Sequence, residues 1–89
     1  MKAIVTVIGK DKVGITANVC TLLAQNNVNV LDITQTILQG YFTMVMLVDV
    51  SACTLSIGDL ADKLEKAGQE LELSIRIQRE EIFNAMHRI

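Results

Sequence analysis

The stretch Gly9-Lys10-Asp11-Lys12-Val13-Gly14 lies between an apolar segment typical of a strand and an apolar segment typical of a helix. Two glycines bracket a charged turn. The first N–H groups of a helix that follows such a turn have no partner inside the helix and carry a partial positive charge. The turn is therefore a natural docking point for a small anion or carboxylate. The same pattern also fits glycines that only let the chain reverse direction.

The segments on either side of the turn have different periodicities. Residues 2–8 are rich in β-branched side chains and too short for a typical helix, so they predict a strand. Both faces of this strand are apolar, which favours a place in the middle of a sheet. Residues 15–26 carry apolar side chains at helical spacing and predict an amphipathic helix that ends at Asn26-Asn27.

The next two segments predict a hairpin. Residues 28–38 alternate apolar and polar side chains, which is the pattern of an edge strand with one solvent-exposed face. Gln39-Gly40 is a tight turn, and residues 41–50 then form a second central strand.

A second helix and a fourth strand complete the pattern. Ser56 and Asp59 have the spacing of an N-terminal cap, and apolar residues at helical spacing follow from Ile57. We expect Gly68 to weaken or end this helix. In residues 71–77 apolar and polar side chains alternate strictly, which predicts a strand with a single buried face.

The predicted order is β-α-β-β-α-β, an α+β, ferredoxin-like sandwich. Right-handed crossovers with central first and third strands give a four-stranded antiparallel sheet, order 4-1-3-2, with both helices on one face. We assign residues 1–78 to this domain and residues 79–89 to a short C-terminal amphipathic helix. Its apolar stripe must pack on something, because so short a helix is not stable alone; the stripe comprises Ile82, Phe83, Met86 and Ile89.

The side of the sheet away from the helices carries Val45 and Leu47 and one apolar face of the first strand. A bare apolar patch of this kind favours association. Either the C-terminal helix or a second subunit should cover it. Two sheets joined edge to edge through residues 28–38 are a further arrangement that the sequence leaves open.

Composition excludes several classes of function. A net charge of −2 in 89 residues gives no basic face for direct nucleic-acid binding. No apolar run approaches the roughly 20 residues that span a membrane, and no signal peptide precedes the first strand, so we expect a cytoplasmic protein. Cys20 and Cys53 lack the spacing of a zinc or thioredoxin-type site and are interpreted as structural thiols. No metal or cofactor is predicted.

Other functions of the same fold each lack a required residue. An acylphosphatase-like enzyme needs an arginine in the first turn, which here has only lysines. A metallochaperone needs a C-x-x-C motif in that turn. An RNA-recognition sheet needs neighbouring aromatics on one face, whereas Tyr41 and Phe42 point to opposite faces. We predict no catalytic or metal-binding role for His87, the sole histidine, and we predict that the chain is not an enzyme.

The strand order, the turn from Gly9 to Ile15 and the entry Asn27-Val28-Asn29-Val30 together resemble an ACT domain. The resemblance covers residues 1–78. In detail the chain is similar to small stand-alone bacterial ACT proteins and to the halves of the glycine cleavage system transcriptional repressor. Residues 82–89 also resemble the tail of those stand-alone proteins.

The resemblance implies a regulatory, non-enzymatic module that binds an amino-acid-like ligand at the interface of a homodimer. It implies that Asp11 accepts hydrogen bonds from a ligand ammonium, that the Gly14 and Ile15 amides hold its carboxylate, and that Asn29 does both. Some members carry a polar side chain, often His, at the position of Gly9. The implied ligand-binding residues are Gly9, Asp11, Val13, Gly14, Ile15 and Asn29.

Plain structural roles remain open for two of these residues. Asp11 is also compatible with capping the following turn, and Asn29 with satisfying backbone groups at the strand entry. The alternative function is a ligand-free regulator that engages a protein partner through its sheet face or C-terminal helix.

Overall fold

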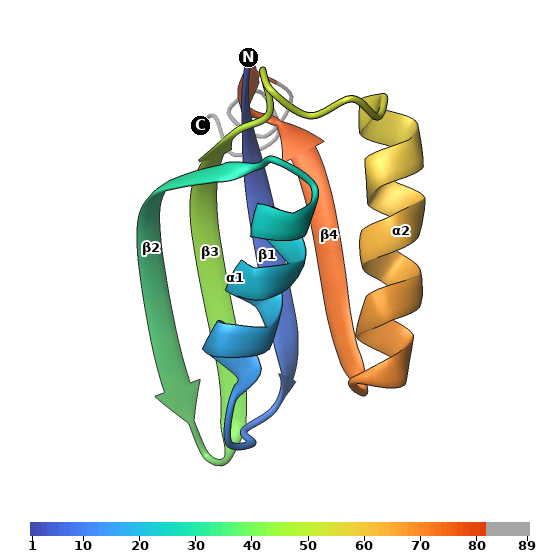
Figure 1. Ribbon diagram of the computed structural model, residues 1–89. Helices are drawn as coiled ribbons and strands as arrows, with labels where there is room; N and C mark the ends of the chain where they lie inside the picture. Colours follow the sequence, from blue (N-terminus) through green and yellow to red (C-terminus); the bar gives the residue numbers. More distant parts are fainter. Residues whose placement is uncertain (82–89) are drawn as a thin grey trace.

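The computed structural model describes residues 1–81 and confirms the predicted fold. Its sheet is antiparallel with the order β2-β3-β1-β4, which is the predicted order read from the other edge. Both helices lie on one face of this sheet (Figure 1). The elements are β1 (Lys2–Lys10), α1 (Ile15–Gln25), β2 (Asn29–Leu38), β3 (Tyr41–Asp49), α2 (Ile57–Glu70) and β4 (Leu73–Arg79). The predicted apolar stripe at 82–89, together with His87, lies outside the described residues.

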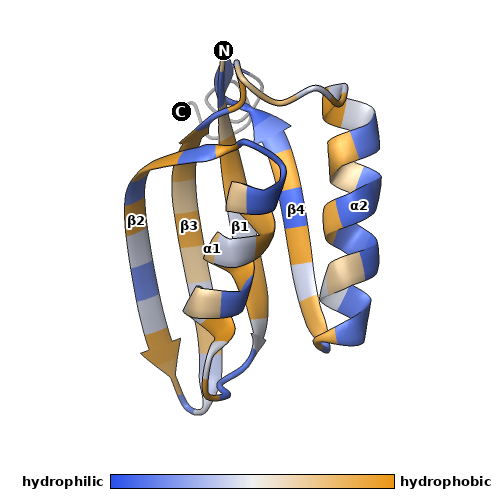
Figure 2. Ribbon diagram, in the orientation of Figure 1, coloured by the Kyte–Doolittle hydropathy of each residue, from blue (hydrophilic) through white to orange (hydrophobic). Residues whose placement is uncertain are grey.

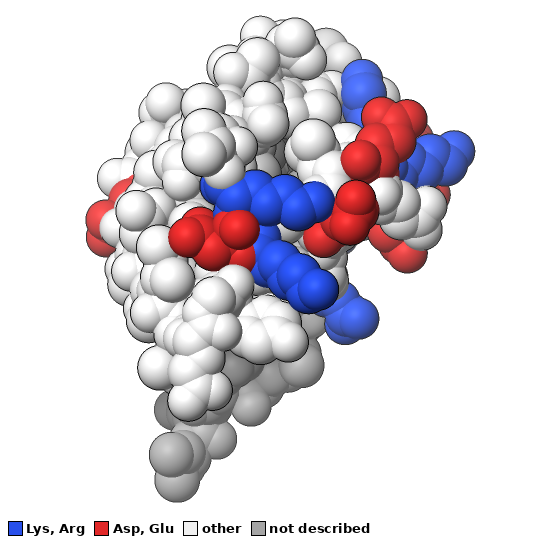
Figure 3. All heavy atoms as spheres, turned by 90° about the horizontal axis from the view of Figure 1, so that it is seen from below, with Lys and Arg blue, Asp and Glu red and all other residues white. Residues whose placement is uncertain are grey.

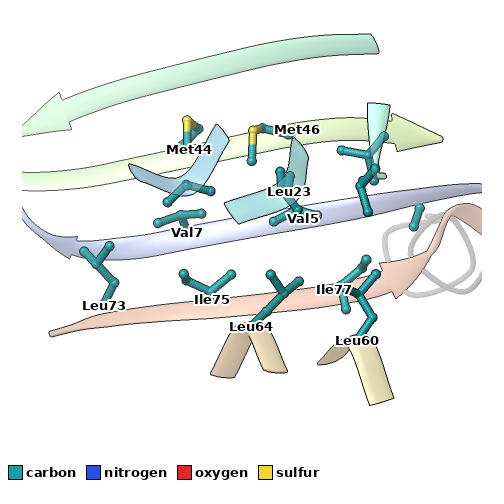
Figure 4. Close-up of a cluster of buried hydrophobic side chains, with 14 of the residues drawn as sticks. Val5, Val7, Leu23, Met44, Met46, Leu60, Leu64, Leu73, Ile75 and Ile77 are labelled. Atoms are coloured by element: carbon teal, nitrogen blue, oxygen red, sulfur yellow. The ribbon is translucent and has the colours of Figure 1, made fainter. Parts of the chain in front are cut away.

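The core lies between the sheet and the two helices. Val5 and Val7 of β1 point toward the helices and are completely buried. Figure 4 shows Leu23 of α1 close to the central strands and Leu64 of α2 beside β4. Each buried side chain of this size contributes roughly 1.5–3 kcal/mol to folding. The core is aliphatic and also includes Ala3, Val19, Met44, Met46, Val48, Leu60, Leu73, Ile75 and Ile77.

The second helix begins as predicted but does not end at its glycine. The Asp59 N–H donates to the Ser56 side-chain oxygen at 3.1 Å, so Ser56 caps the helix. The helix then continues past Gly68 to Glu70. Gly68 is buried where the helix packs against β4, and an added Cβ would lie 2.7 Å from the Leu73 carbonyl oxygen. A glycine at position 68 therefore permits close packing of α2 against β4.

The strand β2 is more exposed than its pattern predicted. Ile33 and Ile37 remain 39% and 56% exposed, so the expected dry face of this strand is not buried. They pair with buried residues of β3 and therefore face the helix side of the sheet. The first helix lies over the centre of the sheet (Figure 1) and reaches β2 through the Thr16 hydroxyl, which donates to Gln35 Oε1 at 3.2 Å. It does not cover the Ile33 and Ile37 side chains. Figure 2 shows the hydrophobic end of this strand at the edge of the molecule.

We predict that Gly68→Ala lowers the free energy of unfolding by about 1–3 kcal/mol, because the new methyl group forces apart two packed backbones. The matched control is Gly58→Ala in the first turn of the same helix, where nothing but a serine oxygen at 3.9 Å lies near the new Cβ. That change should be neutral or stabilising by up to about 1 kcal/mol, since alanine is the better helix former. Urea unfolding curves compare the two variants, and equal midpoints would contradict the packing role of Gly68.

Candidate functional site

Three turns meet at one end of the sheet. The Asp11 N–H donates to the Gly40 carbonyl oxygen at 2.8 Å and ties the turn after β1 to the turn between β2 and β3. Lys12 Nζ lies 3.5 Å from Glu72 Oε1, which links the same turn to the connection between α2 and β4. Figure 3 views this end and shows acidic and basic side chains gathered in its centre.

The contributions of Gly40 and Glu72 to this end were not predicted. The predicted antiparallel order was sufficient to find them, because it places all three connections at the same end of the sheet.

The N-terminus of α1 opens onto this end. Gly14 precedes the helix with a φ of 86°, a left-handed conformation that glycine adopts without strain. The first helical hydrogen bond runs from the Asn18 N–H to the Gly14 carbonyl oxygen at 2.9 Å. Amides 15–17 therefore lack a partner inside the helix. Within the described chain no side-chain hydrogen bond caps the N-terminus of this helix.

The other predicted residues of the turn have distinct surroundings. The Val13 side chain is fully exposed, at 103% of its reference area. The Ile15 side chain is buried in the core, so only its amide faces the turn. Gly9 is not part of the turn but lies in β1, where an added Cβ would come within 2.5 Å of Leu73 Cδ2. Close packing against β4 therefore accounts for a glycine at this position.

Asn29 lies at the opposite end of the same sheet. It pairs with Asp49, which pairs in turn with Lys2, whereas Lys10 and Tyr41 pair at the turn end. The nine residues of β1 separate the two ends by roughly 25 Å at about 3.3 Å per residue. One chain therefore brings the turn residues together but does not bring Asn29 to them.

The surroundings of Asn29 are polar and charged. Hydrogen bonds from the Ser51 side chain and from its backbone amide lower the pKa of the neighbouring Asp49. The Ser51 N–H donates to Asp49 Oδ1 at 2.9 Å. This carboxylate is therefore ionised at neutral pH beside Asn29.

The described residues offer little else for chemistry. Within 1–81 no three His, Cys, Asp or Glu side chains lie close enough to hold a metal ion. Cys20 and Cys53 are free thiols packed at the margin of the core. In the same part of the chain no helix is long and apolar enough to cross a membrane. The open amides of α1 follow the turn that contains Asp11, and unpaired amides at a helix N-terminus are able to hold a carboxylate.

Comparison with known proteins agrees with this fold. The family model described as ACT domain matches residues 2–78. A UPF0237 protein of Listeria innocua is 52% identical over 89 residues, and the match covers all of both chains. The structure of an ACT domain protein from Streptococcus pneumoniae superimposes with a TM-score of 0.84 at 45% identity and covers 98% of each chain.

A more distant structure shows how the fold is used in a longer chain. It carries the name of a glycine cleavage system transcriptional repressor and aligns with a TM-score of 0.73 at 24% identity. The alignment covers 86% of the present chain but 44% of the other, so the fold corresponds to about half of that protein. With the family match over residues 2–78, these similarities establish that the chain belongs to the ACT domain family, whose members are regulatory modules.

Proposed function

We propose that this chain is a homodimeric regulatory domain that binds a small amino-acid-like ligand between two subunits. The observation that carries the proposal is the uncapped N-terminus of α1, which directly follows the turn that contains the exposed Asp11. Amides 15–17 offer donors and a partial positive charge to a carboxylate. The Asp11 carboxylate offers acceptors to an ammonium group. The two groups together match the zwitterionic part of an amino acid.

The outer edge of β2 supports the proposed homodimer. This strand is the last in the sheet, and a bulge at Leu31 interrupts its otherwise regular pairing with β3. After the bulge, the pairing of β2 with β3 is regular as far as Leu38. A two-fold axis at Gln35, the middle of this stretch, pairs Ile33 with the partner subunit's Ile37 and the reverse. Dimerisation then buries the apolar side chains that a single chain leaves exposed.

The same register accounts for the position of Asn29. Antiparallel pairing of two β2 strands places the beginning of one strand beside the end of the other. The partner subunit's Asn29 therefore approaches the turn at Gln39 and Gly40. The Gly40 carbonyl oxygen already accepts the Asp11 N–H. In this proposal each ligand site combines the turn of one chain with Asn29 of the other, and two equivalent sites form per dimer.

We predict that one or a few of the standard amino acids, at 100 times their Kd, raise the melting temperature of the purified protein by about 10 °C or more. A ligand at 100 times its Kd adds about 2.7 kcal/mol of stability, and a small domain converts each kcal/mol into about 4–8 °C. Asp11→Asn should weaken binding tenfold or more, because a charged hydrogen-bond partner is lost. The control Asp62→Asn removes an exposed carboxylate from α2 and should change nothing. If no amino acid shifts the wild-type protein, the alternative of a ligand-free regulator with a protein partner replaces this proposal.

We predict that Gln35→Cys, in a background with both native cysteines changed to serine, forms a disulfide-linked dimer on mild oxidation. Directly opposed residues of antiparallel strands have Cα atoms about 4.5–5.5 Å apart, which is within the range of a disulfide. Asp32→Cys in the same background should remain monomeric on a non-reducing gel, since the proposed axis places it opposite the partner subunit's Leu38. Cross-linking of Asp32→Cys but not of Gln35→Cys would show a different register, and cross-linking of neither would remove the β2 interface.

A further inference from the structure

A groove of about 520 Å³ runs along the other edge of the sheet, between α2 and β4. This volume lies within the range of about 300–1,000 Å³ that is typical of ligand sites. Consecutive residues of the strand line the groove, so it follows the strand edge rather than one face of the sheet. Figure 1 shows α2 beyond the outer edge of β4, where the helix forms one wall. The lining residues are Ala61, Glu65 and Gln69 of α2 and residues 73–78 of β4.

The floor of this groove is the edge of a strand that has one neighbour. β4 pairs with β1, and within residues 1–81 no strand pairs along its other side. Backbone N–H and C=O groups of an edge strand are a template for another extended chain. The wall is a single ridge of α2, because Ala61, Glu65 and Gln69 recur every four residues. A groove between a strand edge and a helix holds an extended peptide by its backbone and reads alternate side chains.

The side chains around the groove differ between its two sides. On the helix side, Ile75 and Ile77 line the groove as core residues that are 3% and 7% exposed, and the ridge carries the exposed Glu65. On the opposite face of the sheet, β4 presents Arg76. Glu65 and Arg76 are exposed, and within the described residues neither makes an ion pair. Successive side chains of an extended peptide alternate between these two sides.

We propose that this groove binds an extended segment of a partner protein, which adds to the sheet beside β4 as a fifth strand. The segment carries apolar side chains and a basic residue toward α2, and an acidic residue next to the basic one toward Arg76. Its charges then complement Glu65 and Arg76, which the described part of the chain leaves unpaired.

A second copy of the chain fits this edge poorly. Symmetric pairing of two β4 strands keeps both α2 helices on the same face of the joined sheet. Each helix already lies beyond its own strand, on the side where the other copy must approach (Figure 1). The two helices would then compete for the same space. The open edge at β2 has no such obstacle, so the two edges suit different partners.

The test is an NMR titration of the ¹⁵N-labelled protein with the peptide acetyl-Val-Thr-Lys-Glu-Val-Thr-amide. Its valines and lysine face α2 when its glutamate faces Arg76. We expect the amide signals of β4 and of the α2 ridge to shift at millimolar peptide, while the turn at 11–14 stays unchanged. The isomer with lysine and glutamate exchanged should bind several-fold more weakly, because it places like charges opposite each other.

The double variant Glu65→Lys, Arg76→Glu should reverse this preference and bind the exchanged peptide better. The control variant Asp62→Lys, Lys66→Glu alters charges of α2 outside the groove and should keep the wild-type preference. A preference that does not reverse, shifts confined to β2 or the turn, or no shift at millimolar peptide would each overturn the proposal. So would a concentration-dependent dimer that the double variant abolishes, which would identify a second copy as the occupant.

Discussion

The pairing of β1 along both of its edges is the constraint on which the rest of the structure depends. Its residues pair with β3 on one side and with β4 on the other, and its helix-side residues are buried from Ala3 to Val7. The chain does not pass from β1 into either of these neighbours by a hairpin. It leaves the sheet at Lys10, turns at Gly14 and continues as a helix across the sheet face, so that β3 and β4 join β1 later in the chain. The open N-terminus of α1 is a direct consequence of this crossover.

The same constraint makes β2 and β4 the two edges and gives them different surroundings. The helix α1 packs over the centre of the sheet and leaves the exposed Ile33 and Ile37 uncovered. The helix α2 packs against β4 so closely that Gly68 is needed at the contact, and it overhangs that edge. The β2 edge is therefore open to the same strand of a second copy, whereas the β4 edge has room only for an extended peptide. This asymmetry follows from where the helices lie, not from the sequences of the two strands.

Local patterns in the sequence were sufficient for the elements and their order, since each strand and helix has a clear period and Ser56 caps α2 as predicted. These patterns did not predict that β2 is exposed. An alternating pattern shows which residues share a face of a strand, but it does not show whether a helix covers that face. They also assigned Gly9 to the turn, whereas its contact is with Leu73, far away in the sequence. The turn residues are neighbours in the sequence, so a local motif was sufficient to predict that they lie together. Asn29 lies far from them because of the antiparallel strand register, which a motif comparison does not take into account.

A site that two subunits share has a thermodynamic consequence of its own. If the ligand contacts the turn of one chain and the partner subunit's Asn29, it binds the dimer more tightly than the monomer. Linkage then requires that dimerisation and ligand binding strengthen each other by the same factor. A chain of 89 residues buries a modest share of its surface alone. In the proposed dimer, the subunit interface and the bound ligand would both add to its stability. In such a module the concentration of a metabolite controls how much of the protein presents the dimeric surface, and this is sufficient for regulation without any catalytic group.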